Sequence, residues 1–127
     1  MLKRMLFISL LLVLFSLSTM AFKVGQNVCA KWGSSWYGAT ITAKDGDKWK
    51  VLYADGDNGS VAATGLIAIP WKPVLKKGDK VLASWGGSAK WYDGTVIEIG
   101  LSQMAFKVKW KDGSTPSWVP ATKIVTH

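Results

Sequence analysis

Apolar and polar residues alternate along most of the chain that follows residue 21. Two such segments lie close together and a third lies near the end, and lysines occupy the intervening positions. The alternating apolar residues are Val28, Ala30 and Trp32, then Trp49, Val51 and Tyr53, and later Phe106, Val108 and Trp110. This period of two predicts short, half-buried antiparallel strands with one face in water. We find no helical period beyond the first 21 residues, so the predicted class is all-β.

The strand pattern occurs twice. Residues 25–41 read GQNVCAKWGSSWYGATI, and residues 78–96 read GDKVLASWGGSAKWYDGTV, with two extra residues between the tryptophans of the second copy. From Trp49 and Phe106 onward we align the copies without a gap, which places Ser60 over Ser117 and Ile67 over Ile124. The chain is therefore predicted to hold two related units, and a duplicated module implies two similar sites.

Each unit predicts five short strands, and a sheet of that size usually curls into a small barrel because a flat sheet leaves exposed edges. We expect a first barrel at residues 22–69, a connector at residues 70–77 and a second barrel at residues 78–127. The connector carries Pro70 and Pro73 around Trp71, so it is short and stiff. We expect the barrels to pack together with Trp71 buried between them.

The first 21 residues have a different character. Lys3 and Arg4 precede an apolar run from Met5 to Phe15, and small residues lead to Ala21. This order is typical of a secretory signal peptide, so we predict cleavage after Ala21 and a periplasmic or secreted protein without stable membrane insertion. A retained N-terminal anchor is the alternative.

The charge of the mature chain limits its partners. Without Lys3 and Arg4, the 16 basic residues become 14 lysines against eight acidic residues, a net charge of +6. Such a surface attracts polyanions, but base-specific readers use the arginine fork, which lysine lacks. The composition therefore favours weak, salt-sensitive attraction of anions. Alternatively, the lysines keep strand edges unpaired and the protein soluble.

The sequence argues against an enzyme. Cys29 is the only cysteine and His127 the only histidine, so no disulfide within the chain, His-based triad or zinc site of His and Cys is expected. We expect Cys29 to be a buried, inert thiol. Residues 55–59 (DGDNG) begin like a calcium loop, but an EF-hand needs a glutamate where Leu66 stands, so we interpret them as a turn. No catalytic residue, metal or cofactor is predicted.

The two copies share a motif set that resembles a known family. The order is Gly-x-x-Val-x-Ala-x-Trp, then Trp-Tyr-x-(Gly/Ala)-Thr-(Ile/Val), then (Tyr/Trp)-x-Asp-Gly, and it covers nearly all of residues 23–126. It resembles the Tudor-type domains of the agenet and Tudor-knot group, which implies SH3-like barrels.

The resemblance implies an aromatic cage for a methylated lysine or arginine in each unit. By position the cage residues are Trp32, Tyr37 and Tyr53 in the first unit, and Trp85, Tyr92 and Trp110 in the second. Gly56 and Gly113 stand where a fourth aromatic is expected, so each cage has three sides, with acids nearby at Asp55, Asp57 and Asp112. Core packing of the same rings is the alternative, because a tiny barrel needs large apolar side chains.

Trp36 and Trp91 are predicted at loop edges, where aromatic residues often take part in recognition. We therefore expect a non-catalytic module that binds methylated or cationic side chains of a peptide or protein through these eight aromatic residues. The alternatives are a polyanion binder that uses lysine faces, for nucleic acid, lipopolysaccharide or cell-wall glycan, and a structural module of the cell envelope. The sequence does not predict an oligomeric state.

Overall fold

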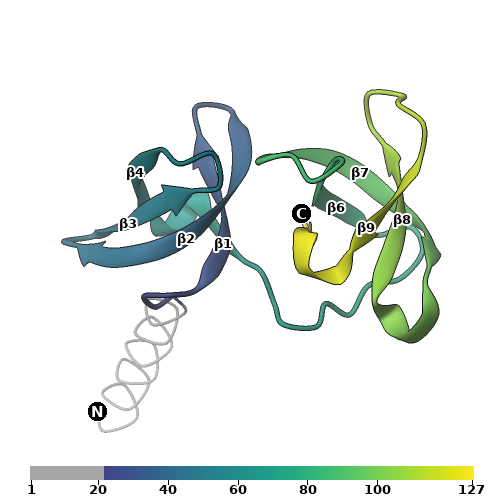
Figure 1. Cartoon of the computed structure of the whole chain (residues 1–127), viewed down its shortest axis with the longest axis horizontal. Helices are drawn as coiled ribbons and strands as arrows, with labels where there is room; N and C mark the ends of the chain where they lie inside the picture. Colours follow the sequence, from purple (N-terminus) through teal and green to yellow (C-terminus); the bar gives the residue numbers. More distant parts are fainter. Residues whose placement is uncertain (1–21) are drawn as a thin grey trace, which may run out of the picture.

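The computed structural model describes residues 22–127 as two small β-barrels (Figure 1). The predicted signal peptide, residues 1–21, lies outside the described residues. The strands of the first barrel are β1 (Asn27–Trp32), β2 (Ser35–Asp45), β3 (Lys48–Tyr53), β4 (Asn58–Ala62) and β5 (Leu66–Ala68). Those of the second are β6 (Lys80–Ser84), β7 (Lys90–Ile99), β8 (Ala105–Trp110), β9 (Ser117–Pro120) and β10 (Ile124–Thr126).

The two barrels have the same strand order. β1 pairs with β2 and β5, and β3 pairs with β2 and β4, so the order in the first barrel is β5-β1-β2-β3-β4. The second barrel repeats it as β10-β6-β7-β8-β9. A bulge interrupts each long strand at the same place, between Ile41 and Ala43 in β2 and between Val96 and Glu98 in β7. Bulges bend strands, which lets one strand contribute to both sides of a small barrel.

The strand register corrects one part of the repeat alignment. Val51 pairs with Gly59 in the first barrel, whereas its counterpart Val108 pairs with Ser117 in the second. Likewise Ile67 pairs with Cys29 as Val125 pairs with Leu82. The gap-free alignment of Ser60 with Ser117 and of Ile67 with Ile124 is therefore wrong by one residue, because the turn between β8 and β9 is one residue longer than its counterpart.

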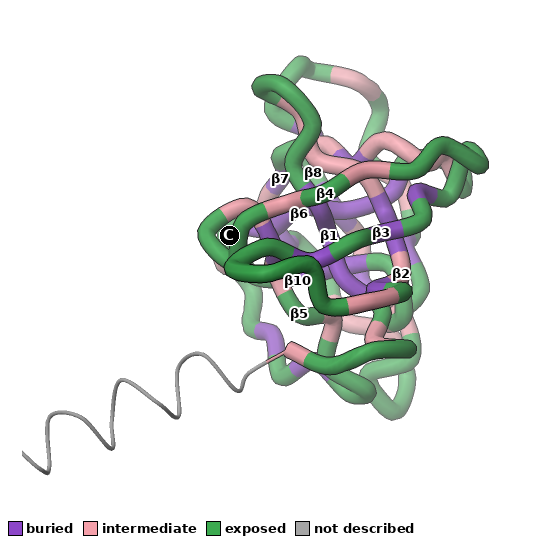
Figure 2. The backbone as a smooth tube through the Cα atoms, turned by 90° about the vertical axis from the view of Figure 1, so that its left-hand side faces the viewer, coloured by how far each residue is buried: buried purple, intermediate pink, exposed green. Residues whose placement is uncertain are grey.

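Each barrel encloses a separate core of alternating strand residues. In the first, Val28, Ile41 and Val51 are fully buried, and Val81, Phe106 and Val108 are fully buried in the second. Figure 2 shows the buried backbone concentrated in the strands and the exposed backbone in the turns. The described residues include 3-10 turns (Ala63–Gly65, Leu101–Gln103 and Ala121–Lys123) but no helix long and apolar enough to cross a bilayer.

The two barrels are joined by a strand pair and by a third apolar cluster. The start of β2 pairs with the start of β7, with Trp36 opposite Trp91 and Tyr37 opposite Lys90. Beside this pair, Cys29, Leu82, Trp91 and Val125 form a buried cluster, covered by Trp36, Ile67 and Ile69. The expectation that the barrels pack together is confirmed.

Trp71 does not take part in this contact. It is 87% exposed. Figure 1 shows the connector as an open loop that runs below the two barrels and not between them for most of its length. The expected burial of Trp71 is therefore wrong. The β2–β7 pair and the cluster around Cys29 make the contact between the barrels without a ring from the connector.

Candidate functional site

Three aromatic rings of the first barrel meet at one end of its strands. Trp32 ends β1, Tyr37 lies near the start of β2 and Tyr53 ends β3. The ring centroids of Trp32 and Tyr37 are 5.7 Å apart, those of Trp32 and Tyr53 are 6.2 Å apart, and those of Tyr37 and Tyr53 are 6.1 Å apart. The structure thus brings together the three residues that the resemblance assigned to one cage.

Tyr53 forms the fixed wall of this cluster. Its hydroxyl donates a hydrogen bond to the Lys31 carbonyl over 3.1 Å, and its buried ring lies over Gly59. A Cβ atom on Gly59 would stand 2.7 Å from Cε2 of Tyr53, so only glycine fits there. Burial, and next the charge of Asp55, raise the pKa of Tyr53, which therefore stays neutral at physiological pH. Trp32 is more than half exposed and forms the open side of the cluster.

The second barrel holds a more enclosed site. Trp85, Tyr92 and Trp110 line a pocket of about 120 Å³ together with Asp112 and Ser114. Trp85 and Tyr92 stand edge to face, with centroids 6.4 Å apart and ring planes at 85°. Trp110 is buried and its indole N–H donates to the Ser117 hydroxyl over 3.0 Å, which fixes the ring. All three aromatic residues assigned by the resemblance therefore line this pocket.

Asp112 gives this pocket a negative charge. The Ser114 backbone N–H donates to its carboxylate over 2.8 Å, and the bonds from Ser114, backbone and then side chain, hold the pKa of Asp112 below its ordinary value. The carboxylate is therefore ionised at neutral pH. In the first barrel the counterpart of Asp112 is Asp55, which accepts a similar bond from the Asp57 N–H over 3.0 Å. The groove of about 600 Å³ beside Trp32, however, is lined by Asp57 and not by Asp55.

The remaining two aromatic residues are each the second residue of a strand, beside the loop that precedes it. Trp36 is in β2 and Trp91 is in β7, and they pair with each other across the junction of the barrels. Trp91 is buried in the cluster around Cys29, and Trp36 packs on that cluster and on His127, at a centroid distance of 5.8 Å. Trp91 therefore belongs to the core of the interface, whereas Trp36 stays half-buried at its surface.

Lys90 is a residue of this region that sequence reasoning missed. Its backbone lies opposite Tyr37 in the β2–β7 pair, and its Nζ atom is 5.2 Å from the ring centroid of Tyr92. Opposite residues of an antiparallel pair share a face, as do residues two apart on one strand. The tyrosines of the two aromatic clusters therefore lie on the same face of this pair, with a lysine between them. Only the pairing of the barrels creates this arrangement.

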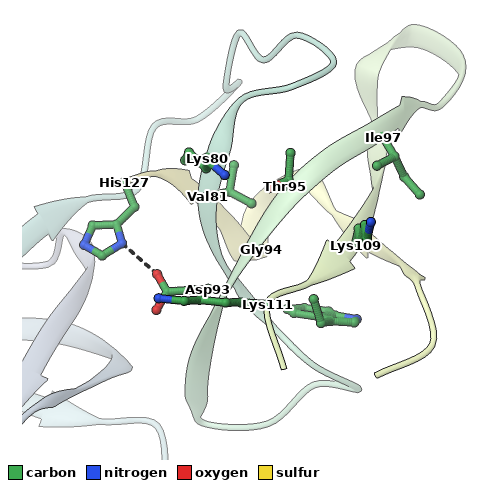
Figure 3. A pocket seen from close by; sticks show the side chains of 10 residues that line it. Lys80, Val81, Asp93, Gly94, Thr95, Ile97, Lys109, Lys111 and His127 are labelled. Carbon is green, nitrogen blue, oxygen red and sulfur yellow. Dashed lines mark hydrogen bonds and ion pairs between the residues drawn. The ribbon is translucent and has the colours of Figure 1, made fainter. Parts of the chain in front are cut away.

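The outer face of the second barrel carries a separate, basic groove of about 680 Å³ (Figure 3). Lys80, Lys109 and Lys111 line it, and His127 pairs with Asp93 over 3.0 Å. The strand register shows that the first-barrel residues equivalent to these three lysines are Asn27, Leu52 and Ala54. The groove is therefore basic in one barrel only.

The described residues offer little for catalysis. Among residues 22–127, no group of three His, Cys, Asp or Glu side chains could hold a metal ion. Burial raises the pKa of the Cys29 thiol to about 12, so little thiolate is present at physiological pH. The expected burial of this thiol is confirmed. The three sites described above offer aromatic faces, the carboxylates of Asp57, Asp93 and Asp112, and lysine side chains.

Comparison with protein-family models and with curated proteins gives no match. Solved structures do resemble the chain. The tandem agenet domains 3 and 4 of ADCP1 are 18% identical and superpose with a TM-score of 0.53, over 88% of this chain and 84% of that one. The corresponding tandem of AGDP1 from Arabidopsis thaliana is 17% identical with a TM-score of 0.55, over 88% and 86%.

A third structure, the SAWADEE domain of SHH1 in complex with an H3K9me3 peptide, is 17% identical over 83% of this chain and 99% of that one. Its TM-score is 0.42, which is too low for the similarity to support a conclusion about the present chain. The two agenet structures, the repeated strand order and the paired barrels agree with one another. The chain has the fold of a tandem agenet domain, a Tudor-type pair of SH3-like barrels.

Proposed function

We propose that the chain is a non-catalytic binding module whose second barrel holds a methylated or otherwise cationic side chain of a peptide. The observation that carries this proposal is the pocket of about 120 Å³ between Trp85, Tyr92 and Trp110, with the Asp112 carboxylate in its wall. Because a water molecule occupies about 30 Å³ in the liquid, the pocket has the size of about four waters. That volume suits a compact alkylated ammonium and is too small for a sugar chain or a base stack.

The chemistry of the walls also selects a cation. An ammonium over an aromatic face gains about 0.5–2 kcal/mol per contact, more when it is desolvated. Asp112 adds charge complementarity, and its low pKa keeps that charge in place. Trp110 is buried, and the hydrogen bond from its indole N–H to Ser117 orients the ring. In the first barrel the three rings contact each other directly, so we assign the main site to the second barrel.

The test is a chemical-shift titration of residues 22–127 with peptides that carry trimethyl-lysine, lysine or a neutral tert-butyl isostere of trimethyl-lysine. We expect the trimethyl-lysine peptide to shift the indole N–H signals of Trp85 and Trp110. The peptide with the neutral isostere should bind with an affinity at least about tenfold lower. Trp85→Ala removes binding, whereas Trp118→Ala, at an exposed tryptophan outside the pocket, does not. Equal affinity for the charged peptide and its neutral isostere contradicts the proposal.

A second candidate function rests on the basic groove of Figure 3. Lys80, Lys109 and Lys111 form no ion pair within residues 22–127, so a polyanion would find three available cations there. Binding of this kind weakens steeply with salt. Lys109→Gln with Lys111→Gln should reduce both the affinity for an oligonucleotide and its salt dependence, whereas Lys44→Gln with Lys48→Gln on the first barrel should not. Affinity unchanged in the groove variant removes this alternative.

A further inference from the structure

Four large apolar side chains protrude from one edge of the second barrel. Trp71 is 87% exposed, Val74 84%, Leu101 93% and Met104 66%. Trp71 and Val74 come from the connector, and Leu101 and Met104 come from the turn between β7 and β8. We call this set the apolar edge. Single exposed apolar residues are ordinary, but contiguous apolar surface generally marks an interaction site.

The two segments of the apolar edge lie side by side. Trp71, Val74 and Met104 line one groove of about 500 Å³, together with Pro120. The Ala121 N–H donates to the Met104 carbonyl over 3.0 Å, which ties the β7–β8 turn to the end of β9. Figure 1 shows the connector and this turn along the same lower edge of the molecule.

The backbone of the β7–β8 turn is shaped to present its apolar residues. Ser102 and Gln103 have positive φ angles of 54° and 56°, a conformation that costs energy in residues other than glycine. They stand between Leu101 and Met104, the two residues that protrude. Gly100 is required beside them, because a Cβ atom there would meet the Ala105 carbonyl oxygen at 2.9 Å. The turn therefore accepts strain while it exposes Leu101 almost completely.

The first barrel provides an internal comparison. The equivalent connection between β2 and β3 is the polar turn from Asp45 to Lys48, with glycine at position 46. It is shorter and contains no apolar residue. Since the common fold is built with a short polar turn in one copy, the fold itself does not require the apolar turn of the other.

The segments that form the apolar edge are positively charged, although the Asp79 carboxylate lies beside them and accepts a hydrogen bond from the Lys76 N–H over 2.9 Å. The three segments, residues 71–77, 101–104 and 120–123, contain four lysines and no acidic residue. These lysines are Lys72, Lys76, Lys77 and Lys123, and all four are exposed. Lysines around an apolar patch are typical of surfaces that meet anionic lipid headgroups, where each adds to the attraction.

We infer that the apolar edge docks peripherally on an anionic lipid bilayer, with Trp71, Leu101 and Met104 in the headgroup region and the lysines against the lipid charges. A tryptophan is well suited to that depth because its ring is amphipathic. A second copy of the chain is a poorer occupant, since four lysines on each copy would face one another. This surface lies apart from the aromatic pocket, so the inference does not depend on the proposed function.

The test uses residues 22–127, which contain both barrel cores, so that the predicted signal segment cannot contribute. Cys29 is fully buried with a pKa of about 12, so a new surface cysteine can be labelled selectively. Leu101→Cys carrying an environment-sensitive fluorophore should shift to the blue with vesicles of phosphatidylcholine and phosphatidylglycerol, and much less with phosphatidylcholine alone. Val24→Cys, an exposed position on the first barrel, is the matched control and should not shift.

Sedimentation with the same vesicles gives the affinity without a label. Leu101→Ser with Met104→Ser should lower the partition coefficient about tenfold or more, and Lys72→Gln with Lys123→Gln should lower it several-fold. Leu52→Ser, at an exposed apolar residue of β3, should leave it unchanged. The far-ultraviolet spectrum and midpoint of thermal unfolding of each variant establish that it folds. Equal fluorescence shifts of the labels at positions 101 and 24 would overturn the inference. So would a chain that binds no vesicles but associates with itself, if the Leu101 and Met104 substitutions abolish that self-association.

Discussion

Cys29 lies at the centre of the contact between the barrels and allows that contact to be tested through pH. Its side chain is fully buried in a cluster with Leu82, Trp91 and Val125. Burial raises the pKa of its thiol from the ordinary value of 9.0 to about 12. Below pH 9 the thiol is protonated in both the folded and the unfolded chain, so the stability it contributes is fully present there.

The sign of the effect follows from the two pKa values. Between pH 9.0 and about 12 the unfolded thiol loses its proton while the folded one keeps it, so the free energy of unfolding falls as pH rises. Each pH unit in this range is worth about 1.4 kcal/mol, so the loss reaches about 2 kcal/mol at about pH 10.5 and about 4 kcal/mol when the folded thiol itself ionises.

The measurement is urea unfolding of wild type and Cys29→Ala at about pH 8 and about pH 10.5. Lysines and tyrosines titrate in both chains, so the difference between them isolates the thiol. We expect wild type to lose about 2 kcal/mol more than the variant over this range. The folded wild type should also resist a thiol reagent at about pH 8 and react once it is unfolded. Equal losses in the two chains, or rapid labelling of the folded protein, would refute the burial of Cys29 between the barrels.

Two further predictions concern the interface and the N-terminal segment. Trp91→Ala should lower the free energy of unfolding by about 3–5 kcal/mol, because it removes the buried ring of the interface cluster. Trp118→Ala, at a ring that is 48% exposed, should cost clearly less, and equal losses in the two variants would contradict the assigned interface. We also predict export. A chain of all 127 residues expressed in a secreting bacterium should be recovered from the periplasm or the medium, and mass spectrometry should show Phe22 as its first residue. Recovery of the intact chain in the membrane fraction would favour a retained anchor instead.

Much of the fold was predictable because short-range patterns encode it. Alternation at Val28 and Ala30 and at Phe106 and Val108 follows directly from the pleat, in which neighbouring side chains point to opposite faces. The two aromatic clusters were predicted by another route, from the resemblance to Tudor-type domains, which assigns three aromatic residues to one end of each barrel. A repeated motif places its residues at the same strand ends in each copy, and strand ends of a small barrel converge.

The interface was less predictable because it depends on which edges meet. The sequence shows that Trp36 and Trp91 are equivalent, but it does not show that their strands pair with each other. That pairing buries Trp91 and leaves Trp71 in solvent. The one-residue shift after β8 was missed for another reason: the matching serines at 60 and 117 favoured an alignment that ignored turn length.

The aromatic residues that gather at the strand ends were assigned by the resemblance to Tudor-type domains. By itself, the sequence determined that the chain is all-β and that it is built from two copies of one unit. These properties depend on residue spacing, and spacing is local. Only the tertiary structure decided which rings are walls and which are interface, that Lys90 lies opposite Tyr37, and that Trp71 and Leu101 form one exposed edge. Those outcomes depend on contacts between residues far apart in the chain, which local spacing does not fix.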